Sequence, residues 1–227
     1  MFDARKMKFL VTAGPTREPL DPVRYLSNRS SGKMGYAIAQ AALDAGHEVV
    51  LVSGPVALEP PAGALVVNVL TSEEMFMAVH SRVTDADVCV LCAAVADFRP
   101  ANVEPRKIKK GARSSLTLEL VPTRDILLSL RDLPRAVDDP RPVVVGFAAE
   151  TDNVIAHATE KLRAKGCALI VANDVSREGV GFESDDNELT LLFASGETRA
   201  MPRSPKNVLA VSLVKIFAGF LQNIVDE

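Results

Sequence analysis

Short, almost wholly apolar runs alternate with longer segments of helical period along this sequence, and that alternation restricts the fold more than any other feature. The run DVCVLCAAVAD (87–97) has no polar residue between its two terminal aspartates, as in a parallel strand that helices cover on both faces. Helical segments at 31–45 and 73–83 alternate with further apolar runs at 7–14, 47–55 and 64–70. This β-α-β-β-α-β order predicts an α/β fold: a Rossmann-like, doubly wound, mostly parallel sheet with helices on both faces.

The second half of the chain continues the pattern and adds a hairpin. Buried strands are expected at 142–150 and 167–174, on either side of a helix at 153–165. The stretch NELTLLFASGETRAM (187–201) alternates around a Ser-Gly turn and predicts a β-hairpin added to the sheet. A closing amphipathic helix is expected after Pro205. No repeat or linker interrupts the chain, so we expect one domain over 1–227.

Two polar stretches fit neither period. GPTREPLDPVRYL (14–26) and FRPANVEPRKIKKGARSS (98–115) carry prolines and charges without alternation, and are expected to be irregular loops. LTLELV (116–121) follows the second of them, and its alternation predicts a strand. A short helix is expected next, at 124–133.

The charge and the apolar pattern exclude several classes of protein. A net charge of −3 over 227 residues gives no general electrostatic attraction for nucleic acid. No apolar run approaches the roughly 20 residues of a membrane span, and the amino-terminal MFDARKMK lacks the apolar stretch of a signal peptide. We therefore expect a cytoplasmic protein that binds neither nucleic acid nor membrane.

The cysteines do not indicate a metal site. Cys89 and Cys92 lie three residues apart on a predicted strand, so their side chains point to opposite faces of the sheet. No second pair of ligands follows them, and buried free cysteine is common. The sequence predicts no metal centre built by the protein, and unpaired thiols fit a reducing cytoplasm.

The stretch SNRSSGKMGYAIA (27–39) is the first candidate for a binding site. It places serines, glycines and a lysine at the start of a helix, where unpaired N–H groups favour anions. The alternative is an ordinary capped helix start with a solvated lysine. The spacing is neither GxxxxGKS/T nor GxGxxG, and no acidic residue follows the second strand at LVSGP (51–55), which disfavours NAD. We expect a loop for phosphate or substrate at Ser30, Ser31, Gly32 and Lys33.

A second group of polar residues follows the predicted strands. Asp97 ends the central apolar run, and the loop after it carries three lysines close together, Lys107, Lys109 and Lys110. These lysines are either a solvated surface loop or point charges for a triphosphate and its metal ion. Two more buried runs end in polar residues, namely Glu150, Asn173 and Asp174. The residues alone support an α/β enzyme that handles a phosphorylated ligand.

Several long motifs resemble, in the same order, those of the phosphopantothenate–cysteine ligase family, the synthetase half of a bacterial coenzyme A biosynthesis protein. They are TAGPTREPLDPVRYLSNRSSGKMGYAIA, LVSGPVAL, AAVADFRP, KIKK, GFAAET and ANDVSREGVGFESDDNELTLL. The resemblance runs from about Lys8 to about Ser204. It implies an enzyme that uses CTP and Mg²⁺ to convert 4′-phosphopantothenate to an acyl-cytidylate with release of pyrophosphate. L-cysteine then displaces CMP and gives 4′-phosphopantothenoylcysteine.

The resemblance also implies roles for individual residues. Asn28 matches the asparagine associated with conversion of the acyl-cytidylate, and Lys107 the lysine associated with its formation. Arg124 stands where the family usually has proline, at the start of a segment that contacts nucleotide. The positions that match nucleotide-binding residues are Asp97, Lys107, Arg124, Asp125, Ile126, Leu127, Phe147, Lys161 and Lys165.

Family members are homodimers, and the predicted strand 116–121 is the candidate contact. The common bacterial arrangement places a flavin-dependent decarboxylase half before this region, on the same or a separate chain. Nothing in these residues suggests FMN. Two other functions stay open: an NAD(P)-dependent reductase on a similar fold, and a non-catalytic nucleotide-binding subunit. The choice between CTP and ATP also stays open from the residues alone, because eukaryotic relatives prefer ATP.

Overall fold

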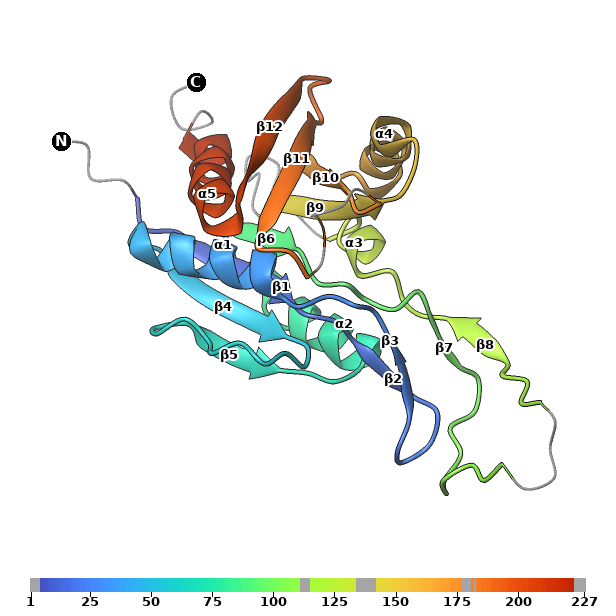
Figure 1. The fold of residues 1–227 in the computed structure, drawn as a ribbon. Coiled ribbons are helices and arrows are strands. Elements are labelled where there is room, and N and C mark those ends of the chain that lie inside the picture. The colour runs from blue at the N-terminus through green and yellow to red at the C-terminus, as the bar shows by residue number, and fades with distance from the viewer. Residues whose placement is uncertain (1–4, 111–114, 134–141, 177–180, 182, 223–227) are drawn as a thin grey trace.

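The computed structural model describes residues 5–110, 115–133, 142–176, 181 and 183–222. Six parallel strands form the centre of the main sheet: β1 (Lys8–Ala13), β4 (Glu48–Ser53), β5 (Leu65–Asn68), β6 (Val88–Leu91), β9 (Val143–Glu150) and β10 (Leu169–Asp174). An antiparallel pair, β11 (Asp186–Phe193) and β12 (Thr198–Pro205), adds to one edge. The eight strands run in the order β12-β11-β10-β9-β6-β1-β4-β5, as Figure 1 shows.

Helices cover both faces of this sheet, which confirms the predicted fold class. α1 (Lys33–Asp44) and α5 (Lys206–Gln222) pack on one face, and α2 (Ser72–His80), α3 (Ile126–Ser129) and α4 (Val154–Lys165) on the other. A single 3₁₀ turn, Val83–Asp85, follows α2. Because the central strands are buried on both faces, successive side chains of one strand enter two different cores. Cys89 belongs to the core between the sheet and α2, α3 and α4, whereas Cys92 packs against the core between the sheet and α1 and α5. Burial raises the pKa of both thiols to about 12, so neither is a reactive thiolate.

The sheet reverses its winding between β1 and β6. From β1 the chain moves to β4 and β5 on one side, and later returns to β6, β9 and β10 on the other. In open α/β sheets, ligands bind beyond the carboxyl ends of the strands at such a switch point. The loops after β1, β4 and β6 are therefore the place to look for a site.

Two small strand pairs extend away from the sheet at this edge (Figure 1). β2 (Arg17–Pro19) pairs with β3 (Tyr25–Ser27), and β7 (Phe98–Pro100) pairs with β8 (Leu120–Pro122). We call the described residues of 98–122 the arm. The prediction of irregular loops at 14–26 and 98–115 was wrong in part, since both contain short strands. The predicted strand at 116–121 was also wrong in extent: only residues from Leu120 onward pair.

Two predicted helices differ in extent from the observed ones. The helix predicted at 124–133 is the four-residue α3; Asp125 caps its start and accepts a hydrogen bond from the Leu128 amide at 2.8 Å. The helix predicted at 73–83 is α2, which ends at His80 and is capped by Thr71. The Thr71 side chain accepts from the Glu74 amide while the Glu74 carboxylate accepts from the Thr71 amide, a reciprocal capping box.

The close approach of two loops at the switch point gives a stability prediction. A Cβ at Gly54 would lie 1.9 Å from the Pro15 carbonyl oxygen, so Gly54→Ala must displace backbone and should cost about 2–3 kcal/mol of unfolding free energy. Gly219 is the control: a Cβ there meets nothing within 4 Å, and alanine in a helix should stabilise by about 0.5 kcal/mol. Urea denaturation measures both, and equal effects of the two substitutions would contradict the packing described.

Candidate functional site

The loop before α1 ends in an uncapped helix start. The residue at the N-cap position is Gly32, with φ of 80°, and no side chain caps the helix. Ser30 instead accepts a hydrogen bond from the Gly32 amide through Oγ at 3.3 Å. The first N–H groups of a helix carry a partial positive charge, and here no side-chain cap competes with a ligand for them. The alternative of an ordinary capped helix start is therefore wrong for α1.

Asn28 is held against the loop that follows β6. Its Nδ2 donates to the carbonyl oxygens of Ala94 at 3.1 Å and Val95 at 3.3 Å. These two bonds can use both protons of the amide, which leaves Oδ1 as an acceptor. The side chain is exposed, so a ligand at the carboxyl edge of the sheet can reach it.

A small pocket lies between the start of α1 and the end of β10. Residues 30–35 line one side of it, and Asn173, Asn187 and Lys206 lie on the other. Asn173 is 8% exposed. Among the described residues, no buried side-chain nitrogen or oxygen lacks a hydrogen-bond partner. Three of the residues that line the pocket, Asn173, Asn187 and Lys206, are polar, so the pocket fits a polar ligand at the start of α1.

Lys206 adds a buried positive charge to the same pocket. Its Nζ donates to the carbonyl oxygens of Gly181 at 2.8 Å and Ser184 at 2.6 Å. Burial is the largest cause that lowers its pKa, and the neighbouring Lys33 lowers it further. Lys33 itself extends from α1 to Asp185, with Nζ 2.6 Å from Oδ1. Two cations and a helix start thus face one polar pocket, which favours an anion.

The second group of predicted site residues lies beyond the end of β6. Leu91, the last residue of β6, pairs with Gly146, so Phe147 lies one residue past the end of that strand. Lys161 on α4 donates through Nζ to the Phe147 carbonyl oxygen at 3.0 Å. Lys165, one turn later, lies 2.5 Å from Oδ2 of Asp125. The structure brings these four residues together at the same edge of the sheet.

The charge of Asp125 is maintained although the side chain is partly buried. Burial raises its pKa, but hydrogen bonds from Lys165 and the Leu128 amide, with the charges of Lys165 and Lys161, bring the net pKa below its ordinary value. Within the folded chain, Lys161 therefore donates to a carbonyl oxygen and Lys165 to a carboxylate. A phosphate that approaches them replaces or shares these partners.

The segment around Arg124 presents backbone rather than side chains. The Arg124 guanidinium lies 3.3 Å from the Glu73 carboxylate and 4.6 Å from the ring centroid of Phe76 on α2. Ile126 and Leu127 are 5% and 8% exposed and belong to the core. Any contact of Arg124, Ile126 and Leu127 with a nucleotide is thus expected through backbone groups, because their side chains are used elsewhere.

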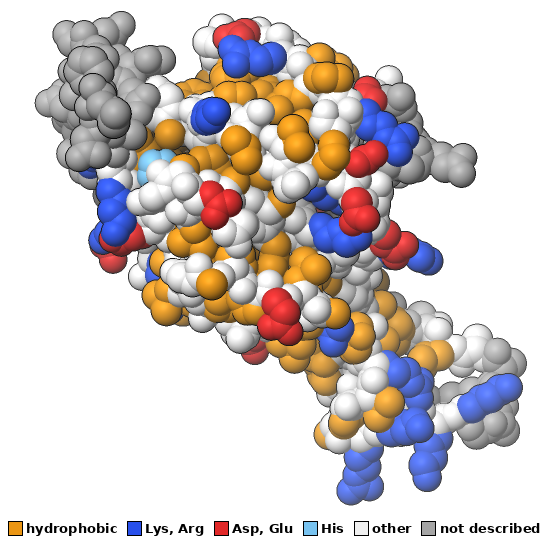
Figure 2. All heavy atoms as spheres, turned by 60° about the vertical axis from the view of Figure 1, so that its left-hand side comes forward, with side chains coloured by type: hydrophobic (Ala, Val, Ile, Leu, Met, Phe, Trp, Pro, Cys, Tyr) orange, Lys and Arg blue, Asp and Glu red, His pale blue; other side chains and the backbone are white. Residues whose placement is uncertain are grey.

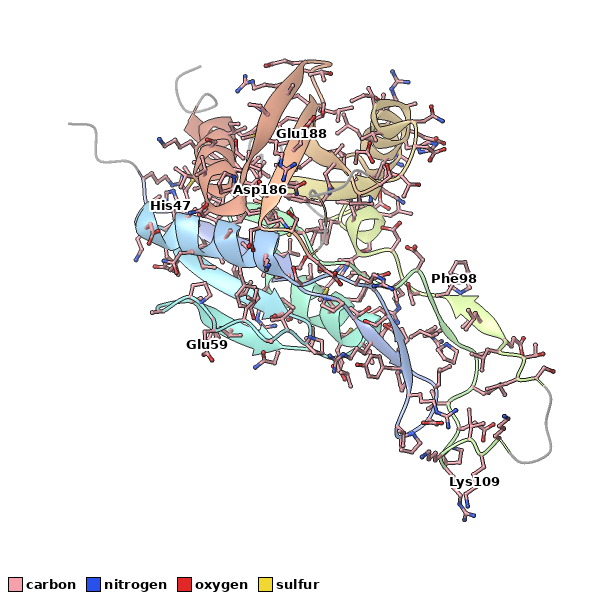
Figure 3. All side chains as sticks on the ribbon, viewed as in Figure 1. His47, Glu59, Phe98, Lys109, Asp186 and Glu188 are labelled. Carbon is pink, nitrogen blue, oxygen red and sulfur yellow. The ribbon has the colours of Figure 1, made fainter. Side chains whose placement is uncertain are left out.

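Lys107 belongs to the arm and Asp97 directly precedes it, and neither residue lines the pocket. Asp97 is exposed where the arm begins, and its carbonyl oxygen accepts from the Thr123 amide at 2.9 Å. Lys107, Lys109 and Lys110 are exposed near the far end of the arm, and Figure 3 shows Lys109 pointing away from the sheet. In Figure 2, blue side chains crowd this end of the arm. The arm thus separates Lys107 from Phe147 and α4 within one chain.

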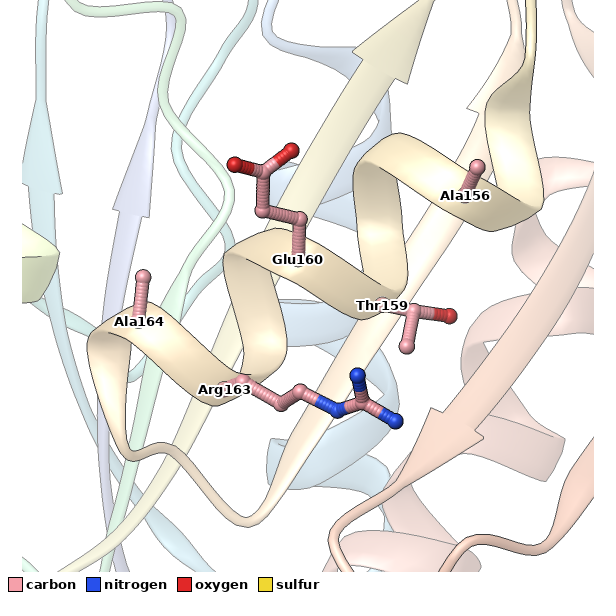
Figure 4. A pocket seen from close by; sticks show the side chains of 5 residues that line it. All are labelled: Ala156, Thr159, Glu160, Arg163 and Ala164. Atoms are coloured by element: carbon pink, nitrogen blue, oxygen red, sulfur yellow. The ribbon is translucent and has the colours of Figure 1, made fainter.

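Other features of the described residues add no catalytic group. Figure 4 shows a shallow hollow along α4, formed by Ala156, Thr159, Glu160, Arg163 and Ala164 on a different face of the helix from Lys161 and Lys165. Within the described ranges, no three His, Cys, Asp or Glu side chains gather as a metal cluster. No described helix combines the length and the apolar character that a membrane span requires.

Comparison with known proteins agrees with this geometry. Residues 4–220 match the family described as DNA/pantothenate metabolism flavoprotein C-terminal domain. The coenzyme A biosynthesis bifunctional protein CoaBC of Vibrio vulnificus is 48% identical over 207 residues, which cover 91% of this chain and 50% of that protein. CoaBC of Escherichia coli is 48% identical over 214 residues, with 93% and 52% covered. The chain spans about half the length of these relatives.

A solved structure matches almost end to end. The crystal structure of the C-terminal domain of CoaBC has a TM-score of 0.81 and 39% identity, and the match covers 97% of this chain and 99% of that one. Fold and site define an α/β protein with a small polar pocket at the carboxyl edge of a doubly wound sheet. The chain belongs to the family of the DNA/pantothenate metabolism flavoprotein C-terminal domain.

The Asn187 side chain leads to a testable prediction. Asn187 is 4% exposed, and its Oδ1 accepts a hydrogen bond from the Glu188 amide at 3.0 Å. Asn187→Leu removes this acceptor and should lower the free energy of unfolding by about 1–2 kcal/mol in urea denaturation. An unchanged free energy of unfolding would show that this hydrogen bond does not stabilise the folded chain.

Proposed function

We propose that this chain joins 4′-phosphopantothenate to L-cysteine, with CTP as the activating nucleotide, in the synthesis of coenzyme A. Family membership supports the reaction class, and one observation of the site carries the proposal. Asn28 is held at the switch point near a polar pocket that an uncapped helix start, the buried Lys206 and Asn173 line. A phosphorylated substrate meets cations there, while its reacting carbon meets a fixed polar side chain. The reaction takes place in the cytoplasm, where these substrates occur.

The first step is transfer of a cytidylyl group to the substrate carboxylate. A carboxylate oxygen attacks the α-phosphate of CTP, the bond to the β-phosphate breaks, and pyrophosphate leaves. Negative charge develops on the phosphates, and fixed cations stabilise it. Lys161 and Lys165 hold the nucleotide beside Phe147, and Lys107 meets the reacting phosphate. Asp125, Ile126 and Leu127 contact the nucleotide through the backbone of the α3 start.

Mg²⁺ binds with the nucleotide in this proposal. The ion usually coordinates substrate phosphates and one or two carboxylates, and Asp97 provides an exposed carboxylate at the start of the arm. When bound, the ion neutralises phosphate charge during the transfer.

The second step uses Asn28. The cysteine amine attacks the acyl carbon, the bond to the CMP oxygen breaks, and the amine loses a proton. The Asn28 amide nitrogen is already engaged with Ala94 and Val95, so Oδ1 is the atom placed to accept from the attacking amine. The role of Asn28 is to orient the nucleophile.

The enzyme acts as a homodimer in this proposal. Apolar side chains that a soluble chain normally buries are exposed on the arm and the neighbouring hairpin: Tyr25 47%, Phe98 53%, Leu116 49%, Leu118 38% and Leu120 42%. Lys107 lies on the same arm, away from the α4 lysines of its own chain. A second copy that packs on this surface would bring Lys107 to the partner's site. A sedimentation coefficient of a monomer at working concentration would count against this arrangement.

The assay of choice measures pyrophosphate release with Mg²⁺, 4′-phosphopantothenate and either CTP or ATP, with and without cysteine. The proposal predicts release with CTP, and CMP with the cysteine adduct only when cysteine is present. Binding of CTP without release would instead indicate a nucleotide-binding subunit. Binding of a nicotinamide cofactor would indicate a reductase.

Two substitutions separate the two steps. Lys107→Gln removes the charge that meets the α-phosphate, so pyrophosphate release should fall at least about 100-fold. Asn28→Asp should still release pyrophosphate while the acyl-cytidylate accumulates. A carboxylate cannot donate to the Ala94 and Val95 carbonyl oxygens that hold Asn28 in place, and the first step does not use this side chain. Lys215→Gln, an exposed lysine on α5, is the charge-matched control and should behave like the wild type. Failure of both variants at the same step would contradict this division of roles.

A further inference from the structure

Asp21 is a buried carboxylate in the turn between β2 and β3. The residue is 3% exposed, and its Oδ1 accepts from the amides of Val23 at 2.7 Å and Arg24 at 2.9 Å. These bonds form an aspartate turn of the kind that an asparagine side chain forms equally well. The turn itself thus uses only one of the two carboxylate oxygens.

The second oxygen reaches the arm. Oδ2 of Asp21 accepts from the Ile108 amide at 3.0 Å, and Arg24 donates through Nη2 to the Ile108 carbonyl oxygen at 2.5 Å. A third bond joins the Glu104 amide to the Leu20 carbonyl oxygen at 3.0 Å. Both backbone polar groups of Ile108, its N–H and its C=O, are therefore hydrogen-bonded to Asp21 and Arg24, which lie more than 80 positions earlier in the sequence. We call this set of three bonds the clasp.

The clasp acts on the backbone next to Lys107. The Ile108 amide belongs to the peptide bond that joins Lys107 to Ile108, and the Ile108 carbonyl to the peptide bond that follows. Fixing both peptide planes sets the backbone conformation of Ile108, and the first of them is also one of the two peptide planes that flank Lys107. The charged groups that face Asp21 are consistent with this role. Burial raises its pKa, but hydrogen bonds from Ile108, Val23 and Arg24 and the Arg24 charge bring it below the ordinary value.

We propose that Asp21 is a positioning residue, which holds the Lys107 segment in the geometry needed for transfer of the nucleotidyl group. This inference rests on the proposed function, because it takes the role of Lys107 from it. The clasp is made within one chain, so each arm is ordered before it meets a second copy. A misplacement of about 1 Å in a catalytic group can cost about 100-fold in rate.

Asp21→Asn tests the clasp with little effect on the turn. The amide keeps one oxygen for Val23 and Arg24, whereas its NH₂ group faces the Ile108 N–H and cannot accept from it. Asp87→Asn is the matched control: Asp87 is 8% exposed and accepts from the Lys8 amide at 2.8 Å, at the opposite edge of the sheet. Both variants are measured by hydrogen exchange at residues 104–110 and by the kinetics of pyrophosphate release.

For Asp21→Asn we expect faster exchange of the Ile108 amide and a kcat lower by about 10- to 100-fold. The Kd of CTP should change by less than about threefold, because the sheet edge binds the nucleotide. Asp87→Asn should show neither effect. Wild-type kcat in Asp21→Asn, or unchanged exchange at Ile108, would overturn the proposal. Absence of pyrophosphate release from the wild type would refute the proposed function instead, and the exchange data would still report on the clasp.

Discussion

The loops after β1, β4 and β6 pack against one another at the switch point, and the arrangement of the site depends on that contact. The chain leaving β1 passes so close to Gly54 that a single methyl group would collide with the Pro15 carbonyl. The Thr16 amide then donates to the Ala94 carbonyl at 3.2 Å, and Asn28 returns to that same carbonyl. The chain between them must leave the sheet, and it does so as the β2–β3 hairpin. Asn28 and the start of α1 are thus fixed by backbone packing, as precise positioning of a reacting group requires.

The site consists of two parts with different physical characters. The edge of the sheet offers fixed cations and a helix start without a side-chain cap, both of which favour phosphate groups. The arm carries lysines and exposed apolar side chains, and among the described residues the clasp and the contact of β7 with β2 join it to the β2–β3 hairpin of its own chain. A reaction that passes through an intermediate can use this division. In the proposed function, the rigid part holds the reactants and the arm supplies charge for one step.

The sequence predicted the sheet because burial on both faces leaves an unmistakable apolar run, as in DVCVLCAAVAD. It predicted Asn28, Phe147, Lys161 and Lys165 through motifs, and the structure places them at one edge; their roles stay predictions. Short strands of three residues carry too little pattern, which is why β2, β3 and β7 were missed. The alternation of 116–121 predicted a half-buried strand, yet Leu116 and Leu118 are exposed in the single chain. Lys206 has no local signal, since its burial depends on a loop far away in the sequence.

The central claim is that one site combines the sheet edge of one chain with the arm of another, and a mixed dimer tests it most directly. Lys107→Gln and Lys161→Gln chains, each with its own affinity tag, are produced together and the mixed dimer is isolated. If the arm acts on the partner's site, one site has both substitutions and the other has neither, so about half of the wild-type pyrophosphate release returns. Release no higher than that of either single variant would show that each arm serves its own chain.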